Sequence, residues 1–292
     1  MNRTFLFAPG DHPRRVQKAL TLPTDAVILD LEDAVAPDAK VMARAAVRSV
    51  LSHPRACRAY VRVNAFDTVL CFGDLTEVVV AGLDGIMLPK LEDPAQLVAV
   101  DWMLGALERE RGLPPGGIDL LPIIETARGH AAVRALALAG AALGGRLRRM
   151  AFGAADYTLD LGMAWTLDEA ELTPVRSEMV LASRAAGLEP PIDTVWAELR
   201  ETEAFARSCA RGAGLGFQGR MCIHPDQLAV ANAAYSPSPE AVASARRIVE
   251  AFEAATSASI QVDGRFVDAP IFDRARRVLA LEARIGALGG RA

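Results

Sequence analysis

The chain alternates short apolar runs with longer stretches of helical periodicity. The apolar runs cover residues 4–10, 26–33, 59–64, 85–90, 118–126, 149–156, 191–196 and 218–225. Segments with apolar residues at helical spacing lie between them, among them residues 13–22, 39–52, 94–112 and 198–214. Strands that alternate with helices are typical of βαβ units and a parallel sheet. Eight apolar runs between residues 4 and 225 predict an α/β fold, a closed (β/α)8 TIM barrel.

An open, doubly wound sheet is the alternative arrangement of such units. A dinucleotide-binding sheet of that kind carries a GxGxxG turn after its first strand. This chain has APGDHP at residues 8–13 instead. The barrel is therefore the favoured prediction.

The pattern changes after the last apolar run. Residues 238–256 predict an amphipathic helix, residues 261–270 a short hairpin around Asp263-Gly264, and residues 271–288 a final helix. We therefore expect a catalytic barrel domain at residues 1–236 and a C-terminal lid or oligomerisation segment at residues 237–292. Such a segment can pack on its own barrel or reach a neighbouring subunit.

Composition and charge narrow the class of protein. Of 292 residues, 51% are hydrophobic and 23% charged, which is ordinary for a globular enzyme. A formal net charge of -4 argues against a nucleic-acid partner. The four cysteines are far apart, so neither a disulfide framework nor a structural zinc site is expected. No apolar run is long enough for a signal peptide or a membrane span, and we expect a cytoplasmic location.

Polar residues gather at the carboxyl ends of the predicted strands. Barrel enzymes place their active sites at this end of the barrel. The run IDLLPIIET ends at Glu125, and the other strand ends supply Asp30, Glu32, Asp33, Arg62, Asn64, Lys90, Asp156 and His224. Each residue alone has a structural explanation. Thr126 and Asp93 can cap the following helices, and His224 before Pro225 can be a turn residue. The convergence of several acids with one arginine favours an active site.

The types of side chain at these ends point to metal-assisted carbon–carbon chemistry. Two carboxylates on separate strands suit a hard cation such as Mg²⁺. The guanidinium of Arg62 can bind a carboxylate or an enolate oxygen with two donors. Lys90 offers a second route through a Schiff base, which requires a lowered amine pKa. The acids nearby should raise the pKa of Lys90, so an ion-pair role is the favoured interpretation.

Seven stretches of this chain together resemble a known family. They are FLFAPG, VILDLEDAV, YVRVN, MLPK, PIIETARG, MAFGAADYTLDLG and GRMCIHPDQLAVANAAYSPSPE, in this order from near the start to about Glu240. The chain resembles the citrate lyase β-subunit-like proteins and the malyl-CoA and citramalyl-CoA lyases of the HpcH/HpaI aldolase superfamily. DLEDAV, IETxxG and FGxxD form a specific signature only in combination.

The resemblance implies a Mg²⁺-dependent lyase that cleaves a 3-hydroxyacyl-CoA into acetyl-CoA and a 2-keto acid. Glu125 and Asp156 would be the Mg²⁺ ligands and, with Arg62, would bind the substrate. Arg62 would also stabilise the enolate oxygen. Glu32 and Asp33 would act at one remove, through metal-bound waters or Arg62. The family also implies a homo-oligomer, a trimer or a hexamer.

The resemblance extends to the C-terminal segment. VDGRFVDAP is similar to the lid of the malyl-CoA lyase branch, which reaches over a neighbouring subunit's site. Asp268 occupies the position of the acid/base that exchanges a proton with the methyl carbon of acetyl-CoA. Asp268 can also be the N-cap of a helix that begins near Pro270.

Three alternatives stay open at this point. The first is a citryl-acyl-carrier-protein lyase β subunit, and the second is a metal-dependent aldolase that acts on free hydroxy-diacids. The third is a non-catalytic scaffold, against which Glu125, Asp156, Arg62 and Asp268 all argue. The choice among glyoxylate, pyruvate and oxaloacetate depends on the volume of the pocket, which the sequence does not determine.

Overall fold

The computed structural model describes residues 3–289 and is built around a closed barrel of eight parallel strands. The strands are β1 (Thr4–Pro9), β2 (Ala26–Asp30), β3 (Arg58–Arg62), β4 (Gly85–Leu88), β5 (Asp119–Ile124), β6 (Ala151–Phe152), β7 (Ile192–Asp193) and β8 (Gly219–Cys222). Each strand pairs with the next in sequence, and β8 closes on β1 with Met221 beside Phe5. The predicted TIM barrel is confirmed, and all eight apolar runs contribute a strand.

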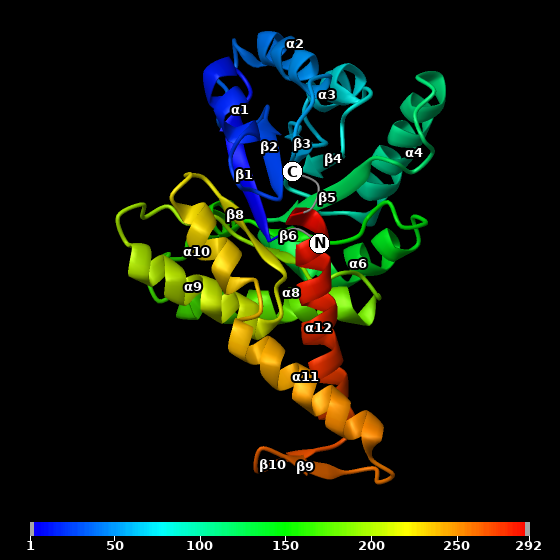
Figure 1. Cartoon of the computed structure of the whole chain (residues 1–292). Helices are drawn as coiled ribbons and strands as arrows, with labels where there is room; N and C mark the ends of the chain where they lie inside the picture. The colour runs from blue at the N-terminus through cyan, green and yellow to red at the C-terminus, as the bar shows by residue number, and fades with distance from the viewer. Residues whose placement is uncertain (1–2, 290–292) are drawn as a thin grey trace.

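Helices surround the barrel (Figure 1). They are α1 (Pro13–Leu20), α2 (Lys40–Leu51), α3 (Cys71–Val78), α4 (Pro94–Glu110), α5 (Ala127–Ala131), α6 (Val133–Ala141), α7 (Ala154–Asp160), the 3₁₀ turn η1 (Ala170–Leu172), α8 (Thr173–Ala185), α9 (Thr202–Leu215) and α10 (Gln227–Ala234). The expected caps are present. Asp93 accepts the N–H of Ala95 at the start of α4, and Thr126 accepts the N–H of Gly129 in α5.

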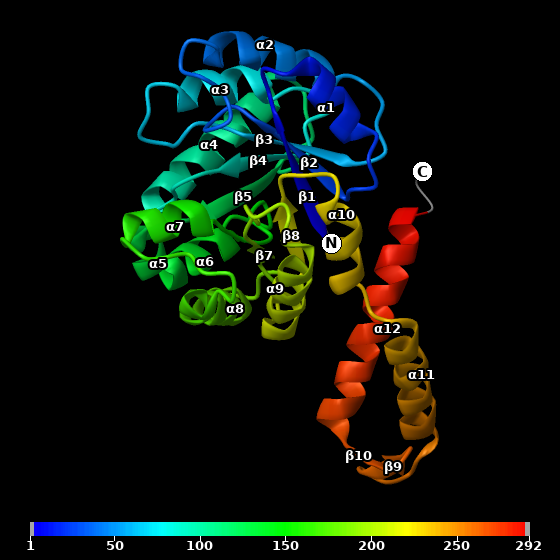
Figure 2. The same ribbon diagram turned by 90° about the vertical axis from the view of Figure 1, so that its left-hand side faces the viewer.

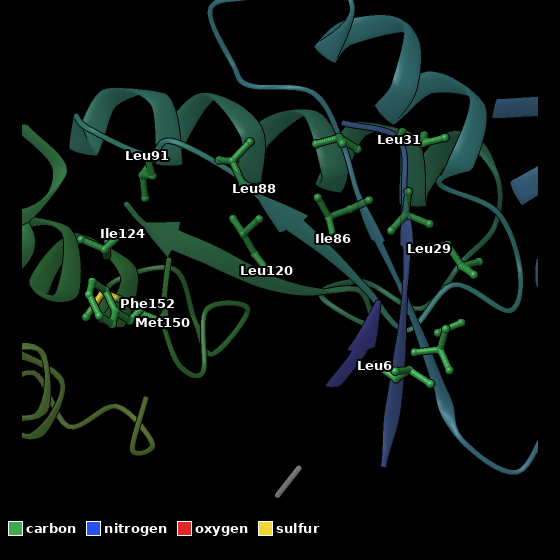
Figure 3. Close-up of a cluster of buried hydrophobic side chains, with 14 of the residues drawn as sticks. Leu6, Leu29, Leu31, Ile86, Leu88, Leu91, Leu120, Ile124, Met150 and Phe152 are labelled. Atoms are coloured by element: carbon green, nitrogen blue, oxygen red, sulfur yellow. The ribbon is translucent and has the colours of Figure 1, made fainter. Parts of the chain in front are cut away.

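Alternate residues of each strand face two different cores, because side chains in a strand point to opposite faces. One set fills the inside of the barrel and includes Phe5, Ile28, Tyr60, Leu121, Ile123 and Met221. The other set packs between the sheet and the helices; Figure 3 shows Leu6, Leu29, Ile86, Leu88, Leu120 and Ile124 from this layer. The strands are therefore apolar on both faces, which explains their continuous hydrophobic runs.

The run at residues 149–156 is a strand for only part of its length. β6 ends at Phe152, and Ala154 already begins α7. The hydroxyl oxygen of Thr194, which follows β7, accepts the N–H of Ala154 at 2.8 Å and so supports the early start of this helix. The prediction that Asp156 ends a strand is therefore wrong. Asp156 lies in the first turn of α7.

The C-terminal segment forms an arm that projects from the barrel (Figures 1 and 2). It consists of α11 (Pro239–Ala254), the antiparallel strands β9 (Ile260–Val262) and β10 (Arg265–Val267), and α12 (Ala269–Gly289). Phe252 and Phe272 stack between α11 and α12 with ring centroids 4.7 Å apart. Asp263 and Gly264 form the turn with φ of 46° and 76°, as expected for a two-residue hairpin loop. The hairpin lies at the end of the arm far from the barrel (Figure 2).

Two further expectations concerned membrane spans and the cysteines. Nowhere in residues 3–289 does a helix combine the length and the apolar character needed to cross a bilayer. All four cysteines are buried as free thiols.

Candidate active site

Strand alternation delivers three charged side chains to the mouth of the barrel. Ile28, Tyr60 and Ile123 fill the barrel interior, and the residue two positions after each also points inward. These residues are Asp30, Arg62 and Glu125. The apolar strand β5 is therefore followed by the carboxylate of Glu125 because this inward-facing position lies at the mouth of the barrel.

Arg62 is held rigidly by the acids of the neighbouring strand. Asp30 and Arg62 are register partners on β2 and β3. Arg62 Nε and Nη2 donate to the two oxygens of Asp30 at 2.7 and 2.6 Å, a bidentate pair. Its Nη1 lies 2.9 Å from Glu32 Oε2 and 3.3 Å from Asp33 Oδ2. All three nitrogens of the guanidinium are therefore paired with acids, while Arg62 still lines the cavity of the site.

Lys90 links the remaining acids of the site. Its Nζ donates to Glu32 Oε1 at 2.6 Å and lies 3.9 Å from Asp33 Oδ2 and 4.0 Å from Asp156 Oδ1. Burial would lower the pKa of Lys90, but the hydrogen bond to Glu32 and the surrounding carboxylates raise it to about 12. Lys90 is therefore an ion-pair partner, as predicted, and is poorly suited to a Schiff base.

Glu125 is the most deeply buried acid of the candidate metal pair, with 3% of its surface exposed. The backbone N–H of Lys90 donates to Glu125 Oε1 at 2.9 Å. A Cβ atom on Gly153 would lie 2.5 Å from Glu125 Oε2, so this position requires glycine to make room for the carboxylate. Burial, followed by the charge of Glu32, raises the pKa of Glu125 to about 8.

Acids outnumber bases in this site. Arg62 and Lys90 face the carboxylates of Asp30, Glu32, Asp33, Glu125 and Asp156. Burial also raises the pKa of Glu32, although Arg62 and Lys90 oppose the shift. An excess of negative charge in a half-enclosed site attracts a cation.

Glu125 and Asp156 fit a Mg²⁺ ion in the chemistry of their donors. Within residues 3–289, no three His, Cys, Asp or Glu side chains converge as a complete protein cage. Enzymes commonly bind Mg²⁺ through only one or two carboxylates and leave the other positions to water and substrate. The two acids supply such an oxygen-only pair, and a cation beside them would offset the acid excess.

A cavity of about 360 Å³ opens over these residues. Asp30, Arg62, Glu125 and Asp156 line it together with apolar residues such as Phe7. A second cavity of about 520 Å³ shares Phe7 and Asp30 with the first and extends along α1, where Arg15 and Lys18 line it. A small acid-rich chamber therefore adjoins a longer cleft with a basic side.

Five of the predicted polar residues do not line this cavity. Glu32 and Lys90 contact the lining residues Arg62 and Asp156, and the other three make different contacts. Asn64 Nδ2 donates to Asp74 Oδ2 at 2.6 Å and supports the loop after β3. His224 Nδ1 accepts the N–H of Asp226 at 3.3 Å, as a turn residue, and the ring lines only the adjoining cleft. Asp268 lies at the base of the hairpin in the arm, where its Oδ1 accepts the N–H of Ile271 in α12 at 3.3 Å.

The sequence did not reveal the roles of Asp30 and Gly153. Asp30 appeared among the strand-end acids, but its two bonds to Arg62 depend on the register of β2 against β3. Gly153 belongs to the FGxxD motif. Glycine is required there because a Cβ atom would collide with Glu125, which follows the neighbouring strand. The role of Asp30 could have been inferred from one signal, an inward-facing acid next to an inward-facing arginine on the following strand.

The fold and the site define a barrel enzyme with an acid-rich centre at the carboxyl ends of its strands. The family model described as HpcH/HpaI aldolase/citrate lyase matches residues 3–225. Citrate lyase subunit beta from Escherichia coli (strain K12) is 36% identical over 283 residues, covering 95% of this chain and 92% of that protein. L-malyl-CoA/beta-methylmalyl-CoA lyase from Cereibacter sphaeroides (strain ATCC 17025) is 36% identical over 293 residues, covering 91% and 90%.

A solved structure is similar over nearly the whole chain. The crystal structure of protein CitE from Mycobacterium tuberculosis in complex with magnesium, acetoacetate and coenzyme A has a TM-score of 0.77 and 31% identity, covering 96% of this chain and 97% of that one. The chain belongs to the HpcH/HpaI aldolase/citrate lyase family, and it is a carbon–carbon lyase.

Proposed function

We propose that this lyase is Mg²⁺-dependent and cleaves a 3-hydroxyacyl-CoA of the malyl-CoA or citramalyl-CoA type into acetyl-CoA and a 2-keto acid. The observation that carries the proposal is the acid-rich chamber in which Arg62, Glu125 and Asp156 line one cavity. The complex of the similar CitE protein with magnesium, acetoacetate and coenzyme A supports the same combination of ligands.

Glu125 and Asp156 would hold the Mg²⁺ ion. When bound, the ion supplies Lewis-acid stabilisation of the negative charge that develops on substrate oxygens. Arg62 contributes a fixed donor to the carboxylate or carbonyl oxygen of the keto acid, because Asp30 already holds the guanidinium in place. Glu32 and Asp33 act through Arg62 and Lys90 rather than by touching the substrate carbon.

The adjoining cleft favours a thioester of coenzyme A. Arg15 and Lys18 present positive charge along a cavity that adjoins the chamber, which suits the phosphates of a nucleotide-bearing substrate. A citryl thioester on an acyl-carrier protein is the second candidate, because a citrate lyase subunit beta is as similar to this chain as a malyl-CoA lyase. A carrier-bound substrate needs partner subunits, whereas a CoA ester does not.

The arm at residues 237–292 is the lid and oligomerisation segment of this proposal. Asp268 lies in the part of the arm that points away from its own barrel, so a catalytic role requires the barrel of another copy (Figure 2). Asp268 of a neighbouring subunit would give a proton to the methyl carbon of the acetyl-CoA enolate. A homotrimer or hexamer brings arm and chamber together, and a monomer in sedimentation at micromolar concentration would contradict this arrangement.

The first test is a substrate panel. The purified protein with Mg²⁺ is incubated with malyl-CoA, citramalyl-CoA and citryl-CoA, with the matching free hydroxy acids, and with a citryl carrier protein. Release of a 2-keto acid from one CoA ester alone supports the proposal. Release only from the free acids, or only with the carrier protein, would replace it by one of the alternatives.

The second test concerns Asp268. Asn caps a helix as well as Asp does but cannot exchange the proton, so Asp268→Asn should leave stability intact and lower kcat by about 100-fold or more. Mixing Asp268→Asn subunits with Arg62→Ala subunits should restore part of the activity, since some shared sites then contain both intact residues. Unchanged turnover of the Asn variant would reduce Asp268 to a helix cap.

A further inference from the structure

Lys90 occupies a backbone conformation that lysine rarely adopts. Leu88 at the end of β4 faces the helices, and strand alternation would turn the residue two positions later the same way. Lys90 instead has a φ of 51°, in the left-handed region, and its side chain reaches Glu32 of the active-site cluster. Its backbone N–H is also bonded to Glu125 Oε1 at 2.9 Å. Strain of this kind at a functional site indicates that the position of the side chain matters.

The ammonium group of Lys90 stands among three acids of the active site. Nζ is 2.6 Å from Glu32 Oε1, 3.9 Å from Asp33 Oδ2 and 4.0 Å from Asp156 Oδ1. The guanidinium of Arg62 is fixed by its two bonds to Asp30. Lys90 carries its charge on a flexible stem and can move, which Arg62 in this setting cannot.

We propose that Lys90 is an internal counter-ion of the metal site and competes with Mg²⁺ for the same carboxylates. This inference rests on the proposed function, because it takes Glu125 and Asp156 as the metal ligands. The ammonium group offsets the acid excess when no metal is bound. A divalent cation at Asp156 is repelled at close range, because Nζ lies 4.0 Å from Asp156 Oδ1 while it donates to Glu32, so Mg²⁺ binds against the charge of Lys90.

If Lys90 competes with Mg²⁺, removing its charge should increase the affinity of the protein for Mg²⁺. Lys90→Met keeps the length, the unbranched stem and the backbone strain but removes the charge. Isothermal titration with Mg²⁺ alone, without substrate, should show about tenfold tighter binding or more for this variant than for the parent protein. Lys90→Arg retains the charge and should bind Mg²⁺ as the parent does, within about threefold. Lys18→Met removes a lysine charge from the outer cleft and is the matched control, with unchanged Mg²⁺ affinity.

A second readout does not depend on activity or on titration heats. In EDTA, Lys90→Met should have a lower Tm than the parent, because the acids lose their cation. Saturating Mg²⁺ should then raise the Tm of the variant more than that of the parent. Lys90→Gln, which keeps a hydrogen-bond donor for Glu32, serves as the uncharged variant if the Met variant does not fold.

The outcomes separate this inference from the proposed function. If the parent binds Mg²⁺ and the folded, uncharged variant binds it equally well or more weakly, Lys90 is no competitor and only this inference falls. If neither parent nor variant binds Mg²⁺, the metal site of the proposed function falls, and this inference falls with it.

Discussion

The barrel contains two clusters of charged side chains that differ in their balance of acids and bases. The active-site cluster at the mouth comprises Asp30, Glu32, Asp33, Arg62, Lys90, Glu125 and Asp156, in which acids are in excess. We call the second cluster the β7–β8 ion network, because Asp193 lies on β7 and Arg220 on β8. It comprises Glu169, Arg176, Asp193 and Arg220, all with 0% of their surface exposed. Arg176 lies 2.9 Å from Asp193 and 3.0 Å from Glu169, and Arg220 lies 3.1 Å from Asp193. Two buried acids here face two buried arginines, and the partly exposed Arg211 also lies 3.3 Å from Glu169.

Glu169 and Glu125, one buried acid from each cluster, have pKa values that are shifted in opposite directions. Burial would raise the pKa of Glu169, but Arg220 and Arg176 lower it to about 2, and Ser208 also donates to its carboxylate. Burial and the charge of Glu32 raise the pKa of Glu125 to about 8. Burial is therefore not what distinguishes the clusters. In the β7–β8 ion network the arginines neutralise the acids, whereas the active-site cluster has surplus acids that a bound cation would neutralise.

The largest effect is expected in the balanced network. Glu169→Gln leaves Arg176 and Arg220 short of one buried negative charge, and breaking such a pair costs about 3–5 kcal/mol of unfolding free energy. Glu178→Gln breaks the exposed pair with Arg134 and should cost less than about 1 kcal/mol. Denaturant unfolding of both variants in EDTA measures the difference. Equal stability of the two variants would show that the network is not structural.

The active-site acids should show the reverse pattern. Glu125→Gln and Asp156→Asn should each lower kcat by about 100-fold or more, because each removes a charge from the proposed metal site. The Tm of the metal-free Glu125→Gln variant should not fall, since the substitution removes a surplus acid rather than half of a balanced pair. Full activity of the parent protein in EDTA would contradict the first expectation. A large loss of stability in Glu125→Gln would contradict the second.

The sequence predicted the barrel and most of the chamber because both follow from local patterns. Apolar runs define the strands, and period-two alternation then turns Asp30, Arg62 and Glu125 inward. Asp156 was placed correctly at the same end but on the wrong element, since a two-residue strand followed directly by a helix leaves no periodic signal.

The β7–β8 ion network could not be predicted in this way. Arg176 lies on α8, and its partners Glu169 and Asp193 come from a loop and from β7. An arginine in an amphipathic helix has the same local pattern whether it faces solvent or a buried acid. Only the packing of α8 against the barrel decides between the two. The catalytic role of Asp268 stays a prediction, because it depends on a second copy of the chain.

The raised pKa of Glu125 predicts that metal-free stability and Mg²⁺ affinity both depend on pH, with smaller effects than the substitutions above. A carboxyl with a raised pKa contributes stability that is complete below its unfolded value of 4.5 and is lost as the pH rises through about 8. The unfolding free energy of the metal-free protein should therefore fall between pH 5 and pH 8. Mg²⁺ binds the ionised carboxylate, so its affinity should rise over this range by at most about tenfold per pH unit.

Titration calorimetry at several pH values measures this affinity. Glu125→Gln should remove most of the pH dependence of metal-free stability, while an exposed acid such as Glu203, neutralised as Gln, should not. A flat profile in the parent protein would mean that Glu125 is ionised throughout and that the acid excess is already offset.

The smallest expected effect tests how the active-site cluster fixes Arg62. Asp30→Asn keeps one hydrogen bond to the guanidinium but loses the charge and the bidentate geometry, so kcat should fall by about tenfold. Asp33→Asn should change kcat by about twofold or less, since Asp33 is exposed and its contact with Arg62 is 3.3 Å long. The two substitutions are chemically identical and neighbour the same guanidinium. Equal effects would mean that Arg62 responds to the total charge around it. A larger effect at Asp30 would mean that the strand register, which places Asp30 beside Arg62, sets the direction of the donor that meets the substrate.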